Sequence, residues 1–266
     1  SPEARAQIRH DLGLDQPLPV QYLRFLQGAI RGDFGTSWRA HQPALELVLD
    51  RLPATLTLAA AAIFIALLLG LALGITAARA RIPAIRTTAN GLIALGQAIP
   101  AFWLGAILVL IFAVNLGWLP SSGRSGPASL ILPAITLAIQ PASLLARLIA
   151  TQLTETMDAD FIRTARSKGL AEPTVLLRHA LRASTGPILA LISIQIGFLI
   201  GGAVVVEGVF AYPGVGLLAL NAVQDRDLPV IQSFVIITAL LISLLTMSAD
   251  LLAKWLDPRL RTASTA

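Results

Sequence analysis

Residues 52–78 read LPATLTLAAAAIFIALLLGLALGITAA, a run of 27 residues without an Asp, Glu, Lys or Arg. An α-helix rises about 1.5 Å per residue, so about 20 residues cross the roughly 30 Å hydrocarbon layer of a bilayer. A charge at the centre of the bilayer costs about 2.5–3.5 kcal/mol on insertion scales, which explains why charges are excluded from such a run. The stretch therefore predicts a transmembrane helix.

Four further stretches share this length and composition: Thr87–Gly123, Ser125–Ala146, Ala183–Val206 and Leu228–Ala249. Buried helices of a soluble domain would show polar stripes at helical period, which these stretches barely do. Charged residues make up 13% of the chain, against roughly 25% in ordinary globular domains. We therefore predict an all-α polytopic membrane protein with five transmembrane helices, and we exclude a soluble enzyme.

Basic residues are distributed unevenly over the connections between these spans. The connections 79–90 and 147–186 and the C-terminal tail hold twelve Lys and Arg, whereas the alternating connections 115–129 and 207–227 hold two. Cytoplasmic loops carry the excess of Lys and Arg. This rule places the connections 79–90 and 147–186 and the C-terminus in the cytoplasm, and residues 1–51 outside. That N-terminal segment holds six Arg and six acidic residues and is long, which makes the rule weak there.

The predicted organisation has three parts. An external segment covers residues 1–51, a transmembrane domain covers 52–256 and a cytoplasmic tail covers 257–266. The polar sequence at the start, SPEARAQIRHDLGL, cannot cross a membrane by itself. We therefore expect a sixth, N-terminal helix that precedes Ser1.

The longest cytoplasmic connection contains TETMDADFIRTARSKGLAEPTVLLRHALRASTGP at 154–187, which predicts two short helices. Asp158 or Thr156 can cap the first helix, and Gly169 can end it in the left-handed conformation. Pro173 fits the first turn of the second helix.

The first of these two helices has a small apolar face formed by Phe161, Ile162 and Ala165. Such a face suits docking into a groove on a partner protein. It suits equally well an amphipathic helix that lies at the membrane interface.

Nine short sequence blocks are informative, and each occurs once. In chain order they are GDFGTSW (32–38), RLPATLTLAAAA (51–62), IPAFWLG (99–105), GWLP (117–120), DFIRTARSKGL (160–170), RHALR (178–182), GGAVVVEGVFAYPGVG (201–216), RDLPVIQ (226–232) and DPRLR (257–261). In this order the blocks resemble the ABC-transporter permeases of the dipeptide/oligopeptide/nickel importer family, the binding-protein-dependent transport inner membrane components.

This resemblance implies a type I ABC importer permease fold in the bacterial inner membrane. It also implies a second permease subunit, two cytoplasmic ATPase subunits and an external substrate-binding protein as partners. The segment 150–186 then corresponds to the EAA-type coupling loop on which an ATPase docks. The resemblance assigns the contact with the ATPase to Asp160, Phe161, Arg163, Thr164, Ala165, Lys168, Gly169 and Leu170.

The loop departs from the general family pattern at two places. Arg163, Thr164 and Ala165 stand where the pattern has Glu-Ala-Ala, as in this subfamily's own version. The later I-x-L-P element is absent, because residues 179–182 read HALR. The docking role is therefore assigned to 158–170 and not to 179–182.

The chain has no residues for an ATP site or other chemistry of its own. A Walker loop needs a glycine before its lysine, but Ser167 precedes Lys168 and Ala253 precedes Lys254. We therefore expect ATP and Mg to bind the partner ATPases, and no catalytic residue, cofactor or metal in this chain. There is no cysteine, and the histidines show no metal-ligand spacing: His10, His41 and His179.

Four residues near the end of the fourth span are candidate gate or pathway residues. Glu207 closes that span, and an intramembrane acid is a functional candidate, although solvation at the outer interface explains it as simply. Tyr212, Pro213 and Gly214 form a turn typical of an external loop or a re-entrant segment.

Small residues and prolines within the spans indicate packing and kinks. The pairs Gly70/Gly74 and Gly197/Gly201 have the four-residue spacing that lets two helices approach closely. Three prolines can kink the helices that contain them: Pro100, Pro133 and Pro141.

The leading functional hypothesis is a permease subunit of an ATP-driven importer for peptides, or for a related solute such as nickel, that works by alternating access. The alternative is a secondary transporter driven by an ion gradient. That class needs acids or cation sites near the midplane, and the cores of these spans contain no acid, base or histidine. A membrane scaffold or channel is a third reading. The identity of the substrate stays open.

Overall fold

The computed structural model describes residues 15–256. The predicted tail 257–266 and the first 14 residues lie outside the described part. The described chain is helical, with one isolated β-bridge between Thr36 and Pro43. Its elements are α2 (Leu18–Ile30), α3 (Ala44–Arg79), α4 (Pro83–Ala98), α5 (Ala101–Leu108), the π-helix η1 (Val109–Asn115), α6 (Ala128–Met157), α7 (Asp160–Ser167), α8 (Glu172–Thr174), the π-helix η2 (Val175–Ala180), α9 (Leu181–Ala183), α10 (Thr185–Val209), α11 (Val215–Gln224) and α12 (Leu228–Leu256).

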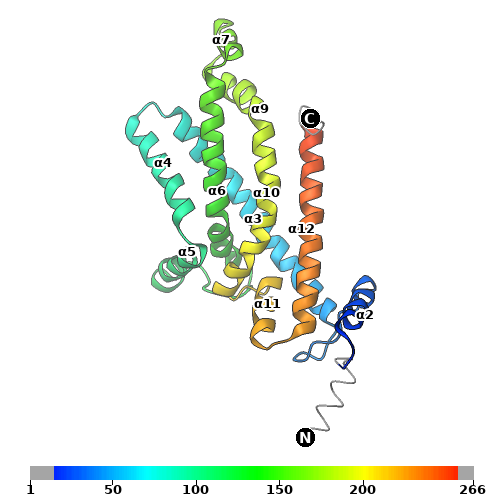
Figure 1. The fold of residues 1–266 in the computed structure, drawn as a ribbon. Helices are drawn as coiled ribbons and strands as arrows, with labels where there is room; N and C mark the ends of the chain where they lie inside the picture. Colours follow the sequence, from blue (N-terminus) through cyan, green and yellow to red (C-terminus); the bar gives the residue numbers. More distant parts are fainter. Residues whose placement is uncertain (1–14, 257–266) are drawn as a thin grey trace.

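Four described helices are long and apolar enough to cross a membrane: α3, α6, α10 and α12. The second predicted span, Thr87–Gly123, is a bent pair instead of one straight helix. Here α4 and the α5–η1 segment meet at 107°, and they make a fifth candidate span only if the pair counts as one (Figure 1). The break falls at Ile99, which is extended because proline disfavours the helical region for the residue before it. Pro133 and Pro141, by contrast, lie inside the continuous helix α6.

Helix α3 begins well before the charge-free stretch that predicted it. Its first turns carry Glu46, Asp50 and Arg51, all exposed, so the predicted boundary at 51/52 falls inside this helix. Absence of charge marks the section of a helix that suits the hydrocarbon layer, whereas the helix itself continues into polar surroundings.

The centre of the fold is the contact between α3 and α6. A Cβ added at Gly74 would lie 2.8 Å from the Ala146 carbonyl oxygen and 2.8 Å from Ile149 Cβ. The backbones therefore approach at the Gly70/Gly74 pair, as predicted. The second pair differs, since a Cβ at Gly201 would meet nothing within 4 Å. A Cβ at Gly197 would lie 3.4 Å from Ile242 Cγ2, an ordinary side-chain contact, so within the described residues this pair brings no two backbones together.

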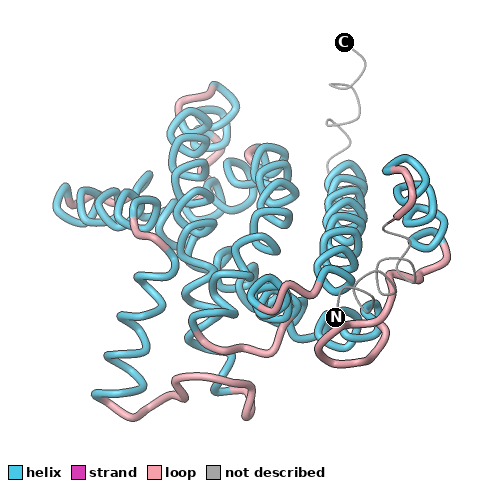
Figure 2. The backbone as a smooth tube through the Cα atoms, turned by 60° about the horizontal axis from the view of Figure 1, so that its bottom comes forward, coloured by secondary structure: helices cyan, strands magenta, loops and turns pink. Residues whose placement is uncertain are grey.

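The two ends of the bundle carry different elements. Helix α7, the turn between α3 and α4 and the last turns of α12 lie at one end, here called the loop end (Figure 1). Helices α2 and α11 lie at the opposite end, here called the α11 end. Figure 2, in which the α11 end comes forward, shows loops connecting the helices there. Charged groups gather at both ends, and these ends contain the residues that the sequence singled out.

Candidate functional site

At the loop end, α7 is a short helix with an acidic residue in its first turn and a basic one in its last. Asp160 and Arg166 occupy these places and so complement the helix dipole. The N-cap is Ala159, which makes no side-chain capping hydrogen bond. The predicted cap by Asp158 or Thr156 is therefore wrong. Helix α6 continues to Met157, so Thr156 lies within that helix and Asp158 is its C-cap.

The apolar face predicted for this helix is divided between two environments. Ile162 and Ala165 are buried and belong to the core cluster that also contains Val175 and Ala180. Phe161 points outward and is 48% exposed. Two of the three apolar residues thus anchor α7 to the rest of its own chain, and Phe161 alone is available to a partner. The expectation that all three form a docking face is wrong.

The predicted coupling residues otherwise lie on the surface. All except Ala165 are exposed: Asp160, Phe161, Arg163, Thr164, Lys168, Gly169 and Leu170. Gly169 has φ +79°, the left-handed conformation predicted for it, and its N–H donates to the Arg166 carbonyl oxygen at 2.9 Å. Pro173 lies in the first turn of the following helix, also as predicted.

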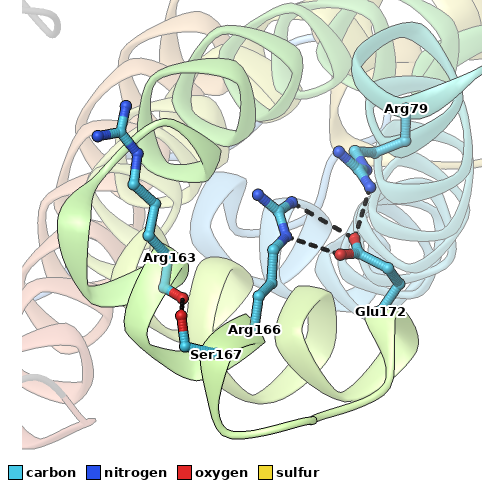
Figure 3. Close-up of polar contacts among 5 residues, drawn as sticks. All are labelled: Arg79, Arg163, Arg166, Ser167 and Glu172. Atoms are coloured by element: carbon cyan, nitrogen blue, oxygen red, sulfur yellow. Dashed lines mark hydrogen bonds and ion pairs between the residues drawn. The ribbon is translucent and has the colours of Figure 1, made fainter.

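Three charged side chains join this loop to the end of α3, and we call them the loop junction: Arg79, Arg166 and Glu172 (Figure 3). Arg166 Nε lies 2.7 Å from Glu172 Oε1, and Arg79 Nη2 lies 2.8 Å from Glu172 Oε2. The hydrogen bond from Arg166 lowers the pKa of Glu172, and the same bond raises the pKa of Arg166. Arg163 points away from this group, and its carbonyl oxygen accepts from the Ser167 hydroxyl at 3.0 Å.

The loop junction was not predicted from the sequence. Arg79 counted there only as a topology-setting charge, and Glu172 only as part of the loop. These two residues lie 93 positions apart, so no spacing rule connects them. An open hollow of about 380 Å³ lies beside the loop and is lined by Pro173, Thr174, Leu177 and Arg178.

At the α11 end, Glu207 is fully buried and caps another helix, together with Thr55. The Thr55 hydroxyl donates to Glu207 Oε1 at 2.6 Å, and the backbone N–H groups of Gly216 and Leu217 donate to Oε2 at 2.7 and 3.0 Å. The N–H of Val215 donates to the Thr55 hydroxyl oxygen at 2.9 Å. The first three N–H groups of α11, which have no partner within that helix, are thereby satisfied. We call Thr55, Glu207 and these amides the α11 junction.

The α11 junction corrects the interpretation of Glu207 as an acid solvated at the interface, because its carboxylate is enclosed by protein. Tyr212 and Gly214 are buried beside it, and Pro213 is partly buried. A Cβ added at Gly214 would collide with the Glu207 carboxylate, so that position has room only for glycine. The structure thus places all four candidate gate residues in the packing around the start of α11. Thr55, the partner of Glu207, was missed because it lies 152 positions away.

Two family models match the chain. The model for "Binding-protein-dependent transport system inner membrane component" matches residues 70–262. The model for the N-terminal part of such membrane components matches residues 1–59. Together these matches extend over most of the sequence.

Curated relatives and solved structures give the same result. The glutathione transport system permease protein of Salmonella paratyphi A is 40% identical over 264 residues, which covers 98% of this chain and 86% of that protein. A putative peptide transport system permease protein of Brucella abortus is 40% identical over 269 residues, with the same shares covered. An inward-facing structure of the MetNI methionine ABC transporter aligns with a TM-score of 0.67 at 17% identity, covering 79% of this chain and 96% of that one. At this identity the structural likeness shows the fold alone.

Proposed function

The chain belongs to the family of binding-protein-dependent transport system inner membrane components, and from this membership we propose that it is the permease half of an ATP-driven importer of short peptides. The observation that carries the proposal is the 40% identity, over nearly the whole chain, to permeases named for glutathione and peptide transport. Membership in this family replaces the alternative of a carrier driven by an ion gradient.

The proposed machine contains a second permease, two ATPase subunits and an external binding protein. The ATPases bind ATP and Mg and perform the hydrolysis, while this multi-pass subunit forms part of the path through the inner membrane. In the proposed orientation the loop end and the C-terminus face the cytoplasm. The excess of Lys and Arg in the connections at that end supports this orientation.

The proposed coupling route starts at the exposed side chain of Phe161, which inserts into a groove on an ATPase. Movement of α7 then displaces the loop junction, because Arg166 on α7 and Arg79 on α3 bind the same carboxylate. Helix α3 packs directly on α6 at Gly70 and Gly74, so a displacement of α3 also moves α6. The loop thus contacts α3 through a salt-bridged junction, in addition to the buried packing of Ile162 and Ala165 in the core cluster.

The test uses the complete complex with both permeases, both ATPases and the binding protein. Phe161→Asp places a charge at the exposed apolar contact, and we expect ATPase capture and peptide uptake each to fall at least about tenfold. The matched control is Tyr22→Asp on α2 at the opposite end, since Tyr22 is an aromatic residue with 60% exposure. This control should capture ATPase like the wild type.

Two outcomes would contradict the proposal. A wild-type subunit that captures no ATPase in the presence of the partner permease would overturn the importer assignment. A Phe161→Asp variant that captures ATPase normally would leave that assignment intact, but it would remove Phe161 from the contact.

A further inference from the structure

A cavity of about 620 Å³ lies between α6 and α10, with residues of α5 and α12 at its margin. Its walls are mostly apolar and include Leu144, Phe198 and Ile242. Two carboxamides also line it, Gln140 from α6 and Gln195 from α10. This volume is in the range of small-molecule binding sites in proteins.

Neither carboxamide has a hydrogen-bond partner within residues 15–256. Gln195 is only 7% exposed, and within the described residues its side chain makes no hydrogen bond. Gln140 is exposed to the cavity side of α6 and makes none within the same part of the chain. The nearby Thr136 hydroxyl differs, because it donates to the Leu132 carbonyl oxygen of its own helix at 2.8 Å.

A carboxamide inside a membrane span that has no hydrogen-bond partner in the protein is unfavourable unless its polar atoms reach a cavity that holds water or a ligand. A Met or Leu would fill the same space without that cost. Polar groups retained within spans generally face a path or a cavity and contact what passes through it. Gln195 is also close to a second, very small void, between α3, α6 and α10, so its surroundings on that side are apolar as well.

We propose that Gln140 and Gln195 hydrogen-bond the backbone amides of a short peptide in this cavity during translocation; this inference rests on the peptide-importer function proposed above. A carboxamide donates through its NH₂ group and accepts through its oxygen, so it matches both groups of a peptide bond. The cavity lining contains no charged side chain, so charged termini are not held there by ion pairs. The apolar walls accept peptide side chains of different shapes. Recognition through the backbone therefore permits passage of peptides that differ in sequence.

The test replaces each carboxamide by methionine, which has a similar shape and lacks the hydrogen-bonding groups. In the complete complex reconstituted in vesicles, we expect Gln195→Met to lower uptake of a tripeptide at limiting concentration about tenfold. The melting temperature should not fall, because the Gln195 side chain makes no hydrogen bond within the described residues. Gln232→Met is the matched control: Gln232 is exposed on α12 and does not line the cavity.

A second substrate sharpens this result. A depsipeptide with one ester in place of an amide lacks one N–H donor, and we expect wild-type uptake of it to be reduced. The reduction should largely disappear in the Gln140→Met/Gln195→Met double variant, because the groups that sense the donor are absent.

The outcomes separate this inference from the function on which it rests. If the wild-type complex imports no peptide, the proposed function fails. If the wild type imports peptides and Gln195→Met does so equally well, the inference fails and the function stands. If Gln195→Met weakens assembly with the partner permease, the carboxamide is an interface group, and the inference is likewise overturned.

Discussion

A glutamate joins neighbouring elements at each end of this permease, and the two glutamates lie in different surroundings. Glu207 in the α11 junction is fully buried, whereas the Glu172 side chain in the loop junction is 42% exposed. Helix α3 takes part in both, through Thr55 at one end and Arg79 at the other. One helix is thus fixed by a buried cap and joined to the loop by a surface ion pair.

The surroundings decide what each junction can do. Hydrogen bonds to a buried carboxylate act at low dielectric and are costly to break. We therefore expect the α11 junction to stay formed. Exposed ion pairs contribute about 0–1 kcal/mol, and salt screens them. The loop junction can therefore form and break at little cost. That property suits the end proposed to follow an ATPase through each cycle.

The largest expected effect comes from breaking the buried junction with Glu207→Ala. This change leaves two backbone N–H groups of α11 and the Thr55 hydroxyl without their acceptor, at a cost of about 3 kcal/mol or more. For a chain of this size we expect the melting temperature of the purified complex to fall by roughly 6–12 °C.

The control for this prediction is Asp50→Ala, which removes an exposed acid from the same end of α3. Its melting temperature should stay within about 2 °C of the wild type. Equal melting temperatures for the Glu207 and Asp50 variants would remove the distinction drawn here between the two junctions.

The sequence predicted the helical membrane fold and four continuous spans, but not the bent pair of α4 with α5–η1 or the α11 junction. Long charge-free runs predicted the spans, because excluding charge from hydrocarbon leaves a signal at every residue of a run. The break at Pro100 was indistinguishable from Pro133 and Pro141, since proline permits either a kink or a stop and the packing of neighbouring helices decides. The pairing of Thr55 with Glu207 depends on the folded arrangement of α3 against α10. No local pattern records that arrangement.

A smaller effect is expected at Gly169, the turn that brings Arg166 on α7 and Glu172 on α8 together. A Cβ at this position would meet no atom within 4 Å, so Gly169→Ala tests backbone strain alone. An L-residue in the left-handed conformation costs about 1–2 kcal/mol. We expect the loop junction to loosen and the number of ATP molecules hydrolysed per imported peptide to rise a few-fold.

The matched control is Gly91→Ala in α4, where an added Cβ also meets nothing within 4 Å and φ lies outside the left-handed region. It should leave coupling unchanged. A Gly169→Ala complex with wild-type coupling would show that the loop does not depend on this turn.

At the loop end, the sequence predicted local backbone conformations but not the packing of α7. Gly169 and Pro173 were predicted in their observed conformations because glycine and proline carry their backbone preferences with them. The burial of Ile162 was not, since an apolar face looks the same in sequence whether it packs on its own chain or on a partner. The structure resolves this ambiguity and leaves Phe161 as the exposed member of that face.

The smallest expected effect is the response of the loop junction to acid. Arg166 holds the pKa of Glu172 below its ordinary value of about 4.3. A carboxyl group whose pKa is lowered in the folded state stabilises that state above its unfolded pKa, and the contribution disappears as the pH falls through the lowered value. We therefore expect the junction to persist from neutral pH through the ordinary titration range of a glutamate and to open only in more acidic solution, once Glu172 is protonated. Spin labels at the exposed residues Ala84, just after the turn that follows α3, and Ala171 would report this as a broadened distance distribution. Glu172→Gln should give the broad distribution already at neutral pH, with no further change on acidification. Opening of the wild-type junction near pH 6 would mean that another group controls it, and the loop end would then lose its role as the ion-paired counterpart of the buried α11 junction.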